Sequence, residues 1–145
     1  MRRRDFITLV SGATVAWPLA ARAQEARRTY HLGVLTVSPR NAPYIVAMFD
    51  ELGRRGFIEG QNLTVDWREY ALQIDVISEF AAELVKGHVD LIYAVGNVGI
   101  RAAQRATATI PICGTTDDMV GSGLVNSLAR PGGNTTGISI LDRKF

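Results

Sequence analysis

Short apolar runs alternate along the chain with segments whose apolar residues recur at helical spacing. Residues 30–37 and 90–95 are mostly apolar without strict alternation, which is typical of strands buried on both faces of a parallel sheet. In residues 62–69 apolar and polar side chains alternate, and this pattern predicts a half-exposed strand at a sheet edge. Two further strands are predicted at 110–115 and 136–141.

Helices are predicted between these strands. The apolar residues of 42–55, 74–86 and 97–107 fall on one helical face in each segment. Asn97 is available as the N-cap of the third helix, and a short helix is expected around 124–129. Strict alternation of strands and helices favours right-handed crossovers and an α/β fold with a doubly wound parallel sheet. With the alternating second strand at the edge, the expected strand order is 2-1-3-4-5.

Residues 1–23 have the features of a cleavable export leader. Arginines precede an apolar stretch at 6–21 that is softened by serine, glycine, threonine and proline. Ala21 and Ala23 are the small residues that signal peptidase requires, so cleavage is expected before Gln24. The alternative is a short membrane anchor, although the stretch is shorter than the roughly 20 apolar residues that span a bilayer.

The start of the leader also favours one export route. Arg3 and Arg4 are followed by a variable, an aromatic and an aliphatic residue, as in the twin-arginine core. That route exports folded proteins, so Cys113, the single cysteine, needs no oxidative partner and is expected to be a small buried apolar residue. No cysteine lies near the cleavage site, which excludes lipid anchoring there. A soluble periplasmic protein is expected after cleavage.

Most of the positive charge belongs to the leader. The chain of 145 residues has 16 basic and 14 acidic residues, for a formal net charge of +2. Without the four arginines and one aspartate of residues 1–23, 12 basic and 13 acidic residues remain. The mature chain therefore offers no basic surplus for nucleic acid. Its length allows one domain of 24–145, and 47% hydrophobic residues exclude a disordered protein.

Ligands of open α/β sheets bind beyond the carboxyl ends of the strands, where the strand order reverses. Gly96 and Asn97 are the most suggestive residues there, because a glycine allows close backbone approach and the next helix begins with free N–H groups. Such a site suits a carboxylate. The alternative is that Gly96 is only a tight turn and Asn97 only a cap. The complete set of candidate ligand-binding residues is Ser38, Tyr70, Gly96, Asn97, Thr115, Thr116, Asp117 and Asp118.

The hydroxyls and carboxylates of residues 115–118 can receive an ammonium group, or Asp118 can instead cap the short helix that follows. Two adjacent aspartates without other clustered ligands do not indicate a metal site. His31 and His88 have no serine, cysteine or aspartate at a catalytic spacing. The G-x-G-x-x-G fingerprint and a Walker A lysine are both missing, so no cofactor is predicted.

Several stretches together resemble the tryptophan/tyrosine-type substrate-binding proteins of bacterial ABC transporters. The leader is similar to those of the family, and so is the segment LG…GF…EGQNL between residues 52 and 63. The most specific similarity is the run DMV…GLV…SLARPGGN…TG between residues 118 and 137. Met119 departs from the family, which usually has proline there, and 97–98 replace a small hydroxyl residue and proline.

This resemblance implies the first lobe of a two-lobed, type I periplasmic-binding fold, with the second lobe absent and the chain a truncated form. It implies an exported, non-enzymatic component of an ABC importer that binds a small carboxylate-bearing solute such as an amino acid. The expected partners are that solute and the permease and ATPase subunits, with self-association through the exposed lobe face. The alternatives are a small doubly wound enzyme that uses Asp117 or Asp118 as an acid/base, and a non-functional remnant.

Overall fold

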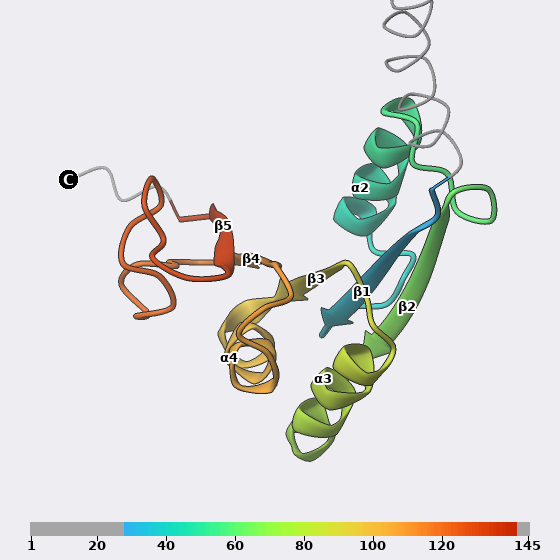
Figure 1. The fold of residues 1–145 in the computed structure, drawn as a ribbon. Coiled ribbons are helices and arrows are strands. Elements are labelled where there is room, and N and C mark those ends of the chain that lie inside the picture. The colour runs from blue at the N-terminus through green and yellow to red at the C-terminus, as the bar shows by residue number, and fades with distance from the viewer. Residues whose placement is uncertain (1–27, 142–145) are drawn as a thin grey trace, which may run out of the picture.

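The computed structural model describes residues 28–141, which form a single parallel sheet with helices on both sides (Figure 1). Each strand but the fourth is followed by a helix or by the end of the described chain. In chain order the elements are β1 (Tyr30–Thr36), α2 (Pro43–Arg54), β2 (Leu63–Glu69), the 3₁₀ turn η1 (Ile74–Val76), α3 (Ile77–Lys86), β3 (Leu91–Val95), α4 (Gly96–Ala106), β4 (Ile112–Thr116) and β5 (Thr135–Ser139). The predicted leader lies outside the described residues.

The strand order is β2-β1-β3-β4-β5 with every neighbouring pair parallel, as the sequence predicts. β1 is the central strand of the first three, and its Val34 pairs with Trp67 of β2 and with Tyr93 of β3. The last five residues of β1 are all buried, which confirms a strand covered on both faces. The α/β doubly wound fold is therefore confirmed.

Two apolar clusters hold the layers together. On one face, Leu35, Ile92 and Ile112 of the sheet pack in one cluster with Leu84 of α3 and Ile100 of α4. All five side chains are fully buried, so this cluster forms the main core. Burying such an aliphatic side chain stabilises the fold by about 1.5–3 kcal/mol.

The opposite face is covered by α2 over β1 and β2. Phe49 and Leu52 of α2 pack against Leu32, Val34 and Leu63. Figure 1 shows α2 on one side of the sheet, and α3 and α4 on the other. The connection through α2 runs from β1 outward to β2, whereas those through α3 and α4 run across the sheet in the opposite direction. Helices on opposite faces therefore give these crossovers the same hand, as the right-handed rule requires.

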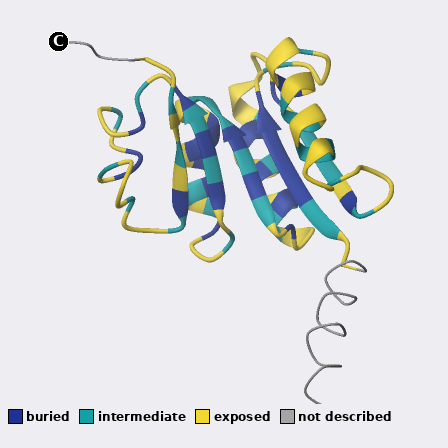
Figure 2. Ribbon diagram, turned by 90° about the horizontal axis from the view of Figure 1, so that it is seen from above, coloured by how far each residue is buried: buried dark blue, intermediate teal, exposed yellow. Residues whose placement is uncertain are grey.

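The part of this second face over β3, β4 and β5 has no helix above it among residues 28–141. We call it the open face and define it as Val95, Cys113, Thr115, Thr136 and Ile138. Its β3 and β4 residues are half-buried and its β5 residues exposed, whereas their neighbours toward α3 and α4 are mostly buried (Figure 2). The prediction that 90–95 is buried on both faces is therefore wrong for one face.

The predicted helix at 124–129 is also wrong, because residues 117–134 connect β4 to β5 through turns and bends. Leu124 and Val125 are buried in the main core. The apolar pattern at these positions therefore correctly indicated buried side chains, but they reach the core from a loop. The Ser127 hydroxyl accepts a hydrogen bond from the Arg130 N–H (2.9 Å) and donates one to its carbonyl (3.2 Å). Such local bonds compete with helix formation. None of the helices in residues 28–141 is long and apolar enough to span a membrane.

Candidate functional site

The carboxyl end of β3 passes directly into α4 at Gly96. Gly96 has φ +82°, in the left-handed region that favours glycine. No side-chain hydrogen bond caps α4, so the N–H groups of residues 96–98 have no intrahelical acceptor at this carboxyl edge of the sheet, which we call the rim. The prediction that Asn97 is the N-cap is wrong, because the helix begins one residue earlier and Asn97 lies in its first turn.

Asn97 instead joins three elements. Its Oδ1 accepts a hydrogen bond of 2.6 Å from the hydroxyl of Thr116 at the end of β4. Its Nδ2 donates a 3.0 Å hydrogen bond to Oγ of Ser122 in the loop after β4. Thr116 is buried, so its hydroxyl is committed to Asn97. Asn97 therefore fixes the start of α4 against the rest of the rim.

Tyr70 lies beneath the same rim, with only 4% of its surface exposed. Its hydroxyl donates a 3.0 Å hydrogen bond to the carbonyl of Val95, the residue before α4. Burial raises the pKa of the Tyr70 phenol, so the hydroxyl stays protonated as this bond requires. A Cβ on Gly99 would lie 3.0 Å from the same oxygen, so Tyr70 also sits tightly against α4.

A cavity of about 220 Å³ opens at this point of the rim. Three predicted site residues line it, namely Tyr70, Gly96 and Asn97. Its other walls are apolar residues that the sequence analysis did not single out: Val37, Ala71, Leu72, Ile74 and Val98. Pockets that enclose a small molecule usually measure roughly 300–1,000 Å³. The cavity is thus the size of a partial site.

The apolar residues of the cavity wall could have been recognised from the sequence by their positions. Val37 directly follows β1, and Leu72 and Ile74 lie in the segment that joins β2 to α3, with Ile74 at the start of η1. Polar residues are usual at such positions. Leu72 is 95% exposed, and it shares the cavity wall with exposed Val37, Ile74 and Val98. A patch of several exposed apolar side chains commonly marks a contact surface. Ala71 has φ +44°, an uncommon conformation for a residue with a side chain, and it precedes Leu72 directly.

The other predicted residues do not line this cavity. Ser38 is next to Val37, and its N–H donates to the Thr36 hydroxyl at 3.1 Å. Thr115 lies on the open face, where its side chain is hydrogen-bonded to Tyr93. The structure therefore separates Thr115 from Thr116, as alternation along a strand requires.

The two aspartates follow β4 in the connecting loop. Asp118 Oδ1 accepts a 2.7 Å hydrogen bond from the N–H of Gly121 and closes a turn, so it caps a turn rather than the predicted helix. Asp117 is exposed. Within residues 28–141, no group of three or more His, Cys, Asp or Glu side chains is arranged to hold a metal ion.

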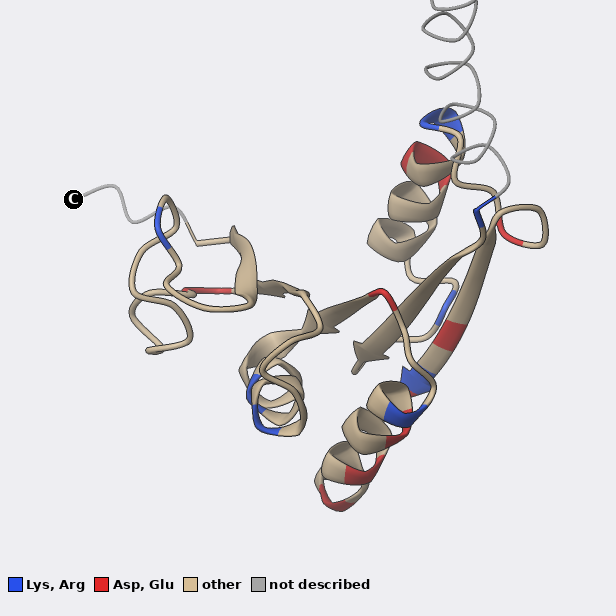
Figure 3. Cartoon of the chain, in the orientation of Figure 1, with Lys and Arg blue, Asp and Glu red and all other residues tan. Residues whose placement is uncertain are grey.

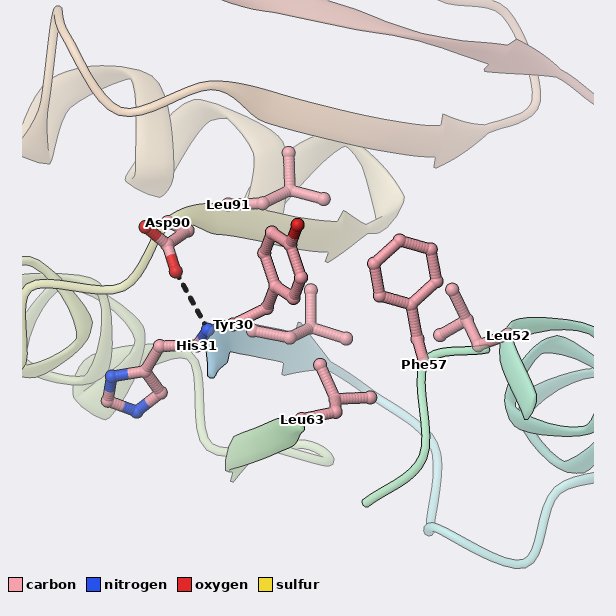
Figure 4. Close-up of a pocket in the computed structure, with 8 residues that line it drawn as sticks. Tyr30, His31, Leu52, Phe57, Leu63, Asp90 and Leu91 are labelled. Carbon is pink, nitrogen blue, oxygen red and sulfur yellow. Dashed lines mark hydrogen bonds between the residues drawn. The ribbon is translucent and has the colours of Figure 1, made fainter. Parts of the chain in front are cut away.

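A second apolar pocket, of about 180 Å³, lies at the opposite, amino edge of the sheet (Figure 4). The rings of Tyr30 and Phe57 meet edge to face with centroids 5.2 Å apart, and Leu91 of β3 lies beside them. Asp90 accepts a 2.8 Å hydrogen bond from the His31 N–H at its border. This pocket is distant from the strand ends that form the rim, so it belongs to a different surface.

Charged residues lie mainly on the helices, on β2 and in the loops (Figure 3). The rim cavity itself is lined without a single charged side chain. The polar side chains in its lining are those of Tyr70 and Asn97, and Gly96 at the start of α4 also lies in its wall. Such a site can bind a molecule that combines a small anionic group with an apolar part.

Three comparisons with known proteins bear on this geometry. A tyrosine-binding protein of Clostridioides difficile is 37% identical over 86 residues, which is 59% of this chain and 25% of that protein. A conserved domain protein from Vibrio cholerae O1 biovar El Tor has 30% identity and a TM-score of 0.72 over 80% of this chain and 40% of its own. A ligand-free, open structure of a substrate-binding protein with adhesive properties from Clostridium difficile has 28% identity and a TM-score of 0.71, over 79% and 40%.

The chain thus spans about a quarter to two fifths of the length of these relatives. The family model described as ABC transporter substrate binding protein matches residues 45–144, more than half of the chain. That range includes every lining residue of the rim cavity except Val37, together with α4 and the loop between β4 and β5. The chain belongs to the family of ABC transporter substrate-binding proteins.

Proposed function

We propose that residues 24–145 form one lobe of a solute-binding protein of an ABC importer, and that the rim at α4 binds an amino acid with an apolar side chain. The observation that carries this proposal is the uncapped start of α4 beside a cavity with apolar walls. The ligand would be held without covalent chemistry, in keeping with a family of binding proteins.

The start of α4 would receive the ligand carboxylate. The N–H groups of residues 96–98 have no intrahelical acceptor, and the helix dipole adds positive potential at this end. Gly96 lets a ligand approach the backbone, because it presents no side chain. Tyr70 and Asn97 would not need to move, since their hydrogen bonds already fix the helix start.

The apolar walls would receive the ligand side chain. Val37, Leu72 and Val98 are 43%, 95% and 49% exposed, so contact with a ligand would remove apolar surface from water. The curated relative that shares 37% identity is named as a tyrosine-binding protein, and this supports an aromatic amino acid. The rim cavity would form one wall of the complete site, and a second lobe would supply the other.

The proposal extends to place and partners. Residues 1–23 would direct export by the twin-arginine route and be removed before Gln24. The mature protein would act in the periplasm, deliver its solute to a permease and depend on an ATPase subunit for transport.

Asn97→Asp tests the carboxylate site. Aspartate keeps the size of asparagine and can still accept the Thr116 hydrogen bond, but it places a negative charge in the first turn of α4. An NMR titration of residues 24–145 with L-tyrosine should shift the amides of residues 96–98, and the variant should weaken binding about tenfold, which is about 1.4 kcal/mol. L-tyrosinamide, which lacks the carboxylate, should bind the variant at least as well as the parent.

Asn126→Asp is the matched control, because it adds the same charge at an exposed loop position. It should leave the tyrosine titration unchanged. Shifts that spare the amides of 96–98, or an equal loss for tyrosine and tyrosinamide in Asn97→Asp, would refute a carboxylate site at α4.

A further inference from the structure

A further cavity adjoins the rim cavity and lies between α3 and α4. Its volume is about 230 Å³, similar to the 220 Å³ of the rim cavity. Ile74, Asn97 and Val98 line both cavities, so the two adjoin along these residues. The rim cavity alone is smaller than the roughly 300–1,000 Å³ of a usual ligand pocket, whereas the two together fall within that range.

The two cavities differ in charge. Ser78 of α3 and Arg101 and Arg105 of α4 line the further cavity, which we call the basic pocket, whereas no charged side chain lines the rim cavity. The two arginines are four residues apart and therefore lie on one face of α4. Like charges at this spacing repel each other, and an anion near both would relieve the repulsion.

The acidic side chains of α3 are directed away from the basic pocket. Glu83 accepts a 2.8 Å hydrogen bond from Arg68 of β2, the edge strand on the far side of α3 from α4. Glu79 lies one turn before Glu83, on the same face of α3. Neither glutamate lines the basic pocket, and neither does Asp75 of η1. The pocket therefore keeps its positive charge toward a ligand.

The arginines lie within reach of the rim. At 1.5 Å per residue, Arg101 and Arg105 begin about 8 Å and about 14 Å along α4 from Gly96. Helical side chains lean toward the N-terminus of the helix, so both arginines extend back toward the rim. Arg101 donates a hydrogen bond to the carbonyl of Ser122, whose hydroxyl bonds to Asn97. A ligand at the start of α4 can therefore contact these arginines with its far end.

We propose that the basic pocket is a second anion subsite of the rim and binds a phosphate or a second carboxylate on the same ligand. The inference rests on the proposed function, because the carboxylate at α4 and the apolar body in the rim cavity determine where the second group lies. Arginine suits both groups, since its planar guanidinium donates two parallel hydrogen bonds to their oxygens. The Ser78 hydroxyl can donate another. The solute is then an amino acid whose side chain is apolar along its length and acidic at its end.

L-tyrosine and O-phospho-L-tyrosine are the matched probes, because they differ only in the phosphate. Both are titrated by NMR into the full chain of 145 residues. O-phospho-L-tyrosine should bind about tenfold more tightly, which is about 1.4 kcal/mol, and the gain is modest because both arginines are exposed. It should also shift the amides of Ser78 and of residues 101–105, which L-tyrosine should leave in place.

A third probe separates the two acidic groups. para-Carboxy-L-phenylalanine carries a carboxylate where O-phospho-L-tyrosine carries its phosphate. A gain for both probes over L-tyrosine would assign the pocket to either anion, and a gain for O-phospho-L-tyrosine alone would assign it to phosphate.

Arg105→Gln identifies the pocket, because glutamine removes the charge and leaves Arg101 on Ser122. The tenfold ratio of the two affinities should fall to about threefold, which is about 0.6 kcal/mol. Arg105→Lys retains the charge and should retain most of the ratio. Arg54→Gln is the matched control, since Arg54 lies in the last turn of α2 as Arg105 does in α4, but on the opposite face of the sheet. It should leave the ratio unchanged.

Three results would overturn the proposal. Equal affinities of the parent for all three probes would show that the pocket takes no second acidic group. An unchanged ratio in Arg105→Gln would assign the phosphate to another place. Shifts at Ser78 and 101–105 without shifts at 96–98 would make the pocket a separate anion site. L-tyrosine that fails to shift the amides of 96–98 would instead refute the carboxylate site at α4, so the two failures are distinguishable.

Discussion

The contact between Tyr70 and Gly99 provides a quantitative test of how the rim is supported. Tyr70→Phe removes the hydroxyl that donates to the Val95 carbonyl while keeping the ring in place. The loss of this largely buried hydrogen bond should lower the free energy of unfolding by about 1 kcal/mol. Gly99→Ala should raise it by up to about 1 kcal/mol through helix propensity alone, because Gly99 lies inside α4.

The two changes should not be additive. The new Cβ would lie 3.0 Å from the Tyr70 hydroxyl oxygen and 3.4 Å from the nearest ring carbon. In the parent this crowding should cost about 1–2 kcal/mol and cancel the helical gain. In Tyr70→Phe the tighter contact is gone, so Gly99→Ala should stabilise. We expect a coupling free energy of about 1–2 kcal/mol between the two sites.

Urea unfolding of the parent, both single variants and the double variant of residues 24–145 measures this coupling. Tryptophan fluorescence and far-ultraviolet circular dichroism should give coincident transitions. Additivity within about 0.5 kcal/mol would show that the hydroxyl does not press on α4. A stabilising Gly99→Ala in the parent would refute the crowding directly.

Three further predictions concern pH, affinity and export. Burial raises the pKa values of Tyr70, Tyr93 and Cys113, so the unfolded chain ionises first. Their contribution to the free energy of unfolding should be complete below about pH 8 and should fall as the pH rises past the ordinary pKa values, 9.0 for the thiol and 10.0 for the phenols. Urea titrations at several pH values would show this fall. Residues 24–145 alone should bind L-tyrosine about a thousandfold more weakly than a two-lobed relative, since losing one wall removes about 4 kcal/mol, and submicromolar calorimetric binding would contradict this. Arg3→Lys with Arg4→Lys should retain the precursor in the cytoplasm, and unchanged processing before Gln24 would exclude the twin-arginine route.

The fold was predictable because its signals are local. The alternation of residues 62–69 identified the edge strand β2, and the mostly apolar run of 30–37 identified β1 as a strand covered on both faces. The prediction of a helix at 124–129 was wrong because Leu124 and Val125 can bury their side chains in the core from a loop as well as from a helix. The Ser127 hydroxyl forms hydrogen bonds with the backbone of Arg130 and stabilises a turn there. A helix of only six residues would have too few internal hydrogen bonds to replace this turn.

The site was predictable in position but less so in detail. The rule that ligands bind at the strand ends located Gly96 and Asn97 at the cavity. The rule could not show that the Tyr70 hydroxyl donates its hydrogen bond to the Val95 carbonyl, because the direction of a side chain in a loop depends on the whole fold. Thr115 and Thr116 are neighbours in sequence, yet strand alternation sends one to the open face and the other to Asn97.

The unequal cover of the sheet divides the domain into parts that open with different ease. β1 lies between helices on both faces, so its amides should exchange with solvent only in global unfolding. β5 is covered on one face and paired on one edge in the described chain, and it should open in sub-global fluctuations. The loop that precedes β5 holds Ser122, a hydrogen-bond partner of Asn97. Each opening of β5 therefore loosens the start of α4, and the rigidity of the rim is limited by the least protected strand of the sheet.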